Sequence, residues 1–232
     1  MEKEKIEMWK TALMGETLLM GMLGRILYKE PDKNWLETLI KEDVFADVPF
    51  GEGQTEIANG LKLLQEWTSQ NSGGIANKQF DAIKKDHLYL FAGVGKPLAP
   101  IWESVYFSEN RMLFQKQTLE VREFYARFGL QAERKGNEPD DHIGLELSFM
   151  AHLATLALQS LEKDDQLQTE ELLQAQRDFL TQHLLRWAPV WAELTEKHAE
   201  TDFFKGVAHL TMGALYTAAE LLDIKIPKEE TK

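Results

Sequence analysis

A run of polar residues, Glu-Pro-Asp-Asp-His at positions 138–142, is the segment of this chain best suited to chemistry. Proline and acidic side chains are also what a helix start favours, because an aspartate there caps free backbone amides. The same residues could instead bind a metal ion together with Glu146 and His152. A di-iron site in a helical bundle needs paired Glu-x-x-His motifs, and this motif does not occur in the sequence. Capping is therefore the favoured interpretation, and no metal ligand is predicted.

A second candidate is the stretch Gly-Val-Gly-Lys at 93–96, which superficially suggests a phosphate-binding loop. Such a loop needs Gly-x4-Gly-Lys-Ser/Thr. Here Pro97 stands where the magnesium-binding hydroxyl belongs, and it also removes a backbone donor. The chain has no Gly-x-Ser-x-Gly elbow and no cysteine nucleophile. The sequence thus predicts a protein that is not an enzyme and holds no cofactor.

An apolar segment bounded by prolines precedes the acidic cluster and includes Leu90, Phe91, Pro100 and Trp102. Tryptophan often dominates interface energetics, and carboxylates at a helix start pair well with guanidinium groups. The two features together suit a ligand that carries an apolar stretch beside positive charge. On spacing alone, it is an equally good interpretation that Leu90, Phe91 and Trp102 are ordinary core residues.

The amino-acid composition limits which cellular compartment and which kind of binding partner are expected. The formal net charge is -12, which disfavours nucleic acid and favours cationic ligands, although acidic charge also simply keeps a protein in solution. The absence of cysteine fits a reducing compartment. The N-terminus lacks the basic region of an export signal, and Glu16 and Arg25 interrupt the apolar stretch 13–27. We expect a cytoplasmic protein that does not insert into a membrane.

Helical periodicity supplies the elements that must position these residues. Apolar stripes predict helices over about 9–28, 143–161, 173–187 (stopped before Pro189) and 207–221 (stopped at Pro227). The only strand signal, at 104–107, has no hairpin partner. The predicted fold is an all-α helical bundle without significant sheet. We expect one globular unit in two helical parts, 1–128 and 140–232, joined by a hinge at 129–139.

The residues at 138–145, EPDDHIGL, closely resemble the E-P-x-D-H signature of the TorD/DmsD/NarJ family of redox-enzyme maturation chaperones. The resemblance spans roughly residues 85–220. It includes Tyr-Leu-Phe-x-Gly at 89–93, Ala-Pro-x-Trp-Glu-Ser-Val-Tyr at 99–106 and His-Leu-Leu-Arg-Trp-Ala-Pro at 183–189. Val94 and Ile101 stand where relatives often carry proline, and Gly95 replaces an aromatic residue of some relatives. These departures bear on which client is served.

The resemblance implies an all-α cytoplasmic chaperone that binds the twin-arginine leader of a molybdopterin oxidoreductase until its cofactor is inserted. It ties leader binding to Asp141 and His142, with Leu90, Phe91, Pro100 and Trp102 lining a groove for the leader's apolar segment. The leader's arginines are expected to meet Glu138, Asp140 and Asp141. Because Asp141 is expected at an exposed helix start, Asp141→Asn should leave the melting temperature nearly unchanged.

Several expectations stay open. Weak GTP binding is implied by the resemblance alone, because no motif for it is present. A hinge that opens lets helical parts exchange between chains, so we expect a monomer with a minor domain-swapped dimer. The main alternative function is a helical assembly factor for a redox-enzyme subunit that uses no leader peptide. A carboxylate–histidine metal enzyme is a more distant alternative.

Overall fold

The computed structural model describes residues 3–93, 95–132 and 138–226. Within them the predicted all-α fold is confirmed, because they form helices and no strand, and the antiparallel bridge between Trp102 and His142 is isolated. The helices are α1 (Lys3–Tyr28), α2 (Lys33–Lys41), α3 (Thr55–Gln70), α4 (Asn77–His87), the π-helical turn η1 (Leu88–Ala92), α5 (Glu103–Phe107), α6 (Lys116–Arg127), α7 (Ile143–Glu162), α8 (Gln166–Phe179), the π-helical turn η2 (Leu180–Leu184), α9 (Leu185–His198) and α10 (Asp202–Leu221).

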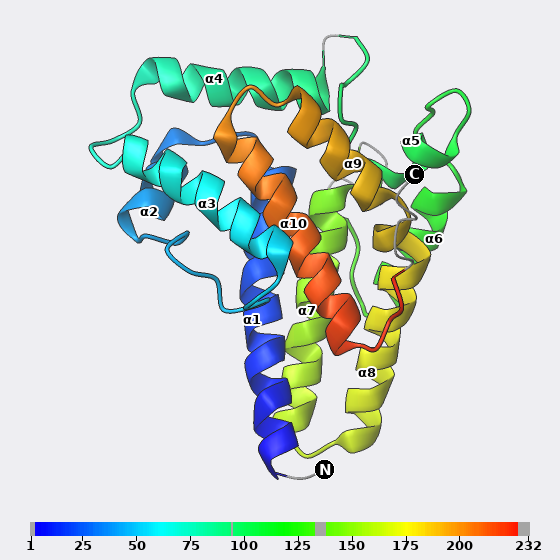
Figure 1. The fold of residues 1–232 in the computed structure, drawn as a ribbon. Coiled ribbons are helices and arrows are strands. Elements are labelled where there is room, and N and C mark those ends of the chain that lie inside the picture. The colour runs from blue at the N-terminus through cyan, green and yellow to red at the C-terminus, as the bar shows by residue number, and fades with distance from the viewer. Residues whose placement is uncertain (1–2, 94, 133–137, 227–232) are drawn as a thin grey trace.

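Helices α1, α7 and α8 run side by side (Figure 1). Helix α10 packs on α3 and on α9. Helix α4 lies across one end of the molecule. Helices α1 and α7 approach closely through two glycines. A Cβ atom on Gly24 would lie 2.8 Å from the carbonyl oxygen of Gly144, and one on Gly144 would lie 2.7 Å from that of Gly24. Because real Cβ atoms do not come so close to backbone, only glycine permits this crossing. It fixes the start of α7 against α1.

One hydrophobic core runs through both of the predicted parts. Leu23 of α1 and Phe91 of η1 belong to the same buried cluster as Leu147 of α7, Trp187 of α9 and Leu210 of α10. Residues 133–137 of the predicted hinge lie outside the described residues, and the two-part division stays a prediction. None of the helices in the described ranges is both long and apolar enough to cross a membrane.

Some predicted boundaries hold and others are wrong. The first helix ends at Tyr28, as expected. The last helix ends at Leu221, before the predicted stop at Pro227. Residues 104–107 form part of α5 and not a strand, and they pair with no strand among the described residues.

Pro189 lies inside α9, where a helix end was predicted. The π-helical turn η2 directly precedes α9, so the regular α-helical hydrogen bonding is already interrupted there. A proline that lacks an N–H group is tolerated at such an interruption more easily than within an uninterrupted helix.

Candidate binding site

Two segments far apart in the sequence, residues 100–104 and 138–143, meet at the start of α7 and form what we call the signature corner. An isolated antiparallel bridge joins Trp102 to His142. The amide of Glu103 donates to the carbonyl of Asp141 at 2.9 Å, and the amide of Ile143 donates to the carbonyl of Ile101 at 2.9 Å. The two motifs that carry the family resemblance are thus one structural unit.

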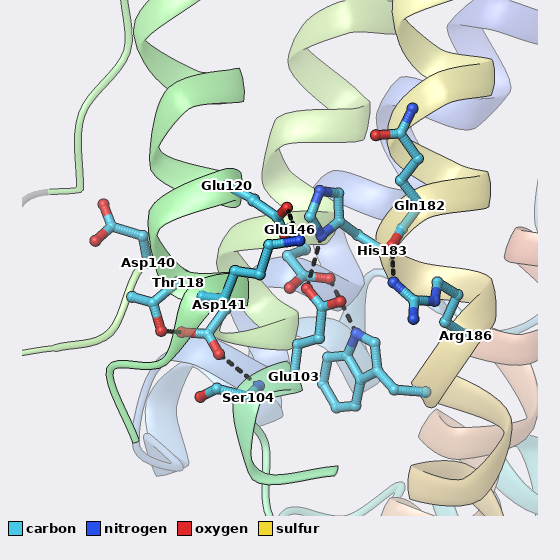
Figure 2. Close-up of polar contacts among 12 residues, drawn as sticks. Glu103, Ser104, Thr118, Glu120, Asp140, Asp141, Glu146, Gln182, His183 and Arg186 are labelled. Atoms are coloured by element: carbon cyan, nitrogen blue, oxygen red, sulfur yellow. Dashed lines mark hydrogen bonds and ion pairs between the residues drawn. The ribbon is translucent and has the colours of Figure 1, made fainter. Parts of the chain in front are cut away.

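Asp141 lies at the centre of the signature corner and is fully buried, at 0% exposure. Its Oδ2 atom accepts a hydrogen bond from the amide of Ser104 at 2.7 Å, and its Oδ1 atom accepts one from the hydroxyl of Thr118 at 2.7 Å (Figure 2). One carboxylate therefore caps the first turn of α5 and secures α6. The expectation of an exposed helix-start residue is wrong, because the starts of α5, α6 and α7 converge on this side chain.

Asp140 is buried beside it and already has a guanidinium partner. Both Nε and Nη2 of Arg122 donate to its Oδ2 atom, at 3.0 and 2.7 Å. This hydrogen bond raises the pKa of Arg122. The hydroxyl of Tyr125 donates to the carbonyl of Asp140 at 3.1 Å. Asp140 thus joins α6 to the signature corner.

His142 is the N-cap of α7, where its Nδ1 atom accepts a hydrogen bond from the amide of Gly144 at 3.0 Å. Its ring meets the rings of Tyr28 and Trp102 edge-on, with centroids 5.2 and 5.9 Å away. Burial lowers the pKa of His142 to about 3, with a smaller effect from His87. The imidazole is therefore neutral at physiological pH and serves as a hydrogen-bond acceptor.

Glu138 and Trp102 are the members of the predicted site that reach the surface, since each is half-buried. The indole Nε1 of Trp102 donates to Oε1 of Glu138 at 2.8 Å. The structure buries the other predicted apolar contacts, Leu90, Phe91 and Pro100. Phe91 lies among aromatic rings of α9 and α10, with Phe204 5.2 Å away. A carboxylate beside an indole edge is thus what the signature corner presents outward.

Next to the corner, a buried acid–histidine pair links α5 to η2. Oε2 of Glu103 lies 2.8 Å from Nδ1 of His183, and Oε2 of Glu146 accepts from the indole of Trp187 at 3.3 Å (Figure 2). Burial raises the pKa of Glu103, opposed by the hydrogen bond from His183. Burial, reinforced by Glu103, raises the pKa of Glu146 well above its usual range. The Oε1 atoms of both glutamates have no hydrogen-bond partner among the described residues.

Sequence reasoning gave no role to this arrangement. Glu103 and His183 entered only within motifs of the family resemblance. The available signal was a glutamate inside an apolar helical stripe, as at Glu146 of α7. Within the part of the chain that the structure describes, no group of three or more metal-binding side chains is positioned to hold an ion.

Comparison with known proteins gives consistent results. The family model for the nitrate reductase delta subunit matches residues 52–193. The chain is 28% identical over 206 residues to the probable Tat proofreading chaperone DmsD of Haemophilus influenzae, covering 89% of this chain and 91% of that protein. It is 34% identical over 138 residues to the chaperone protein TorD of Vibrio cholerae, covering 60% of this chain and 61% of that one.

A solved structure from Archaeoglobus fulgidus, of a protein assigned to redox enzyme maturation, is 22% identical to this chain. It has a TM-score of 0.46, and the match covers 85% of this chain and 92% of that one.

Proposed function

The chain belongs to the nitrate reductase delta subunit family, and on that premise we propose that it is a chaperone for the maturation of a redox enzyme. It binds the twin-arginine leader of a molybdopterin oxidoreductase in the cytoplasm and releases it after cofactor insertion, without catalysing a reaction. The similarity to a Tat proofreading chaperone over 89% of the chain is the observation that carries this proposal.

The outward edge of the signature corner is the proposed contact for the leader. Oε1 of Glu138 is engaged by Trp102, so its other carboxylate oxygen can accept from a leader guanidinium. The half-buried indole offers apolar surface for the stretch that follows the arginines in the leader. Carboxylate–guanidinium hydrogen bonds are charge-assisted and directional. The net charge of -12 also attracts a cationic peptide.

The buried predicted residues have a supporting role in this proposal. Asp140 and Asp141 are hydrogen-bonded within the chain, His142 caps α7, and Leu90, Phe91 and Pro100 are buried. They hold Trp102 and Glu138 in position and do not themselves touch the leader. This arrangement meets the general need of a binding site for a rigid second layer.

Co-purification tests the proposal. The tagged protein is co-expressed with the catalytic subunit of a molybdopterin oxidoreductase from the same organism, with and without its leader. We expect capture of the leader-bearing subunit and loss of most of it when the leader is deleted. Equal capture of both forms would instead support the alternative, a helical assembly factor that binds its client without a leader. Exposed apolar side chains on the α5–α6 connection, described next, give that alternative a physical basis.

A further inference from the structure

An open groove of about 520 Å³ lies between α6 and the chain from η2 to α9. Figure 2 shows Glu120 of α6 opposite His183 and Arg186. His183 is buried and is held by Glu103, so the floor of the groove is fixed to α5. The groove is lined by Lys116, Glu120, Glu123, Phe124, Arg127, Thr181, Gln182, His183 and Arg186.

Two arginines on opposite walls of this groove have no carboxylate partner among the described residues. The guanidinium of Arg186 lies over the ring of Phe107 at 4.5 Å, and that of Arg127 lies over Phe124 at 5.0 Å. Stacking on a ring restricts a guanidinium group and leaves its edge donors available. Lys116, by contrast, is paired with Glu120 at 2.7 Å. Arg186 also donates from Nη1 to the backbone carbonyl of Gln182 at 3.2 Å. Among the described residues the groove therefore holds two arginines and one carboxylate, that of Glu123, that form no ion pair, in a chain of net charge -12.

Exposed apolar side chains on α5, on the connection from α5 to α6 and on α6 form what we call the apolar rim. Met112 is 50% exposed and Phe114 is 48% exposed. The backbone at Phe114 is left-handed, with φ of 57°, which is strained for an aromatic residue. Exposed large apolar groups gathered in one place mark interaction surfaces more often than chance allows. The rim comprises Phe107, Met112, Leu113, Phe114 and Leu119.

The rim and the groove are continuous. Phe107 of the rim lies under Arg186 of the groove. Leu119 lies one helical turn from Lys116 and from Glu123 on α6, so these three side chains share a face of the helix. A ligand on this surface would thus meet apolar side chains and unpaired guanidinium groups together.

We propose that the groove and the apolar rim bind a segment of a partner polypeptide that carries carboxylate side chains beside apolar ones. Carboxylates match the planar donors of Arg127 and Arg186, and apolar side chains cover Met112 and Phe114. The charge is opposite to the one that a twin-arginine leader presents. This surface is therefore separate from the edge formed by Trp102 and Glu138, and the proposal does not depend on leader binding.

Two fluorescent peptides of equal length test the proposal, one of leucine and glutamate and the other of leucine and lysine in the same order. Anisotropy titrations use the full chain, the double variant Arg127→Gln with Arg186→Gln, and the control variant Arg25→Gln. Arg25 is also exposed and stacked on an aromatic ring, Trp35, at 4.4 Å, but it does not line the groove. Thermal melts of each variant check that it is folded.

We expect the glutamate peptide to bind the unchanged protein and Arg25→Gln alike, and to bind the double variant about fivefold more weakly or worse. The double variant Arg127→Lys with Arg186→Lys, which keeps the charge, should recover part of the affinity. The lysine peptide should bind more weakly than the glutamate peptide. Equal binding of the two peptides, no effect of the arginine changes, or no binding of the glutamate peptide at millimolar concentration would each overturn the proposal.

Discussion

The signature corner and the apolar rim are joined through α5 but differ in which side chains they bury and which they expose. In the corner, the carboxylates of Asp140 and Asp141 are buried and each accepts hydrogen bonds from the chain. In the rim, Met112 and Phe114 are apolar and about half exposed, with no covering element. The buried carboxylates of the corner form hydrogen bonds that hold α5, α6 and α7 together. The apolar side chains of the rim are exposed, and we propose that a partner polypeptide covers them.

We propose that this difference separates residues that build a binding site from residues that contact a ligand. On that proposal Asp141 belongs to the motif because it holds α5, α6 and α7 together, and not because it touches the bound peptide. Removing a buried acceptor should then lower stability, whereas removing an exposed apolar group should lower only partner binding.

The largest expected effect on stability concerns Glu16, a buried carboxyl group that does not have the two hydrogen-bond donors that Asp141 has. Glu16 of α1 is 0% exposed, and burial raises its pKa to about 8. With the amide nitrogen of Gln176 turned toward Glu16, it donates to the two carboxyl oxygens at 2.9 and 3.2 Å. Burial alone causes the pKa shift, and no charge among the described residues opposes it. Glu16 is thus protonated in the folded state at neutral pH and ionised in the unfolded state.

A folded-state pKa above the unfolded value means that this contribution to stability is fully present below about pH 4.5 and is lost as pH rises to about 8. Between these values we expect the free energy of unfolding to fall by roughly 1.4 kcal/mol per pH unit from this group. Glu16→Gln should remove that slope and stabilise the protein at pH 8. Urea unfolding of both proteins at several pH values measures the difference. Parallel pH profiles would contradict the assignment.

Asp141→Asn tests the corner itself. Asparagine can still accept from the amide of Ser104, but it then turns its NH2 group toward Thr118, whose hydroxyl must change from donor to acceptor, and both hydrogen bonds lose the carboxylate charge. We expect a loss of about 2 kcal/mol, which lowers the melting temperature by several degrees in a chain of this size. The matched control is Asp165→Asn, because Asp165 caps α8 from an exposed position where asparagine caps equally well. If both variants melt alike, the corner is not the support that we describe.

The sequence was a good guide to the helices and a poor one to the burial of Asp141. The apolar stripe through Leu147, Met150 and Leu161 predicts α7 because that signal is local and repeats. The partners of Asp141 stand 37 and 23 positions away in the chain, at Ser104 and Thr118. Nothing in the local pattern reveals that three helix starts converge on one carboxylate.

Other failures have the same origin. A helix end was predicted at Pro189 because a proline normally breaks the ladder, but a preceding π-helical turn cannot be recognised from residue types. The pairing of Glu103 with His183 joins residues 80 positions apart. Trp102 and Glu138, which lie in the predicted motifs, are half-buried and reach the surface, and their contact with a leader stays a prediction.

The smallest effect on stability is expected at the rim. The double variant Met112→Ser with Phe114→Ser removes exposed apolar surface, so its free energy of unfolding should stay within about 0.5 kcal/mol of the unchanged protein. Binding of the leucine–glutamate peptide should weaken in the same variant. Chemical denaturation and anisotropy titration measure the two quantities on one preparation. A drop of several degrees in melting temperature would mean that the rim belongs to the core and is not a free surface.

The most direct test of the account is a calorimetric titration of a twin-arginine leader peptide into Glu138→Gln and into Asp141→Asn, at a temperature where melts show both to be folded. We predict that Glu138→Gln melts close to the unchanged protein and binds the leader about fivefold more weakly or worse, with less salt dependence. We predict that Asp141→Asn melts several degrees lower and binds the leader within about twofold of the unchanged protein. The opposite result would be that Asp141→Asn melts normally but no longer binds the leader, while Glu138→Gln binds it as before. That result would contradict the proposal that Asp141 supports the site and Glu138 contacts the leader.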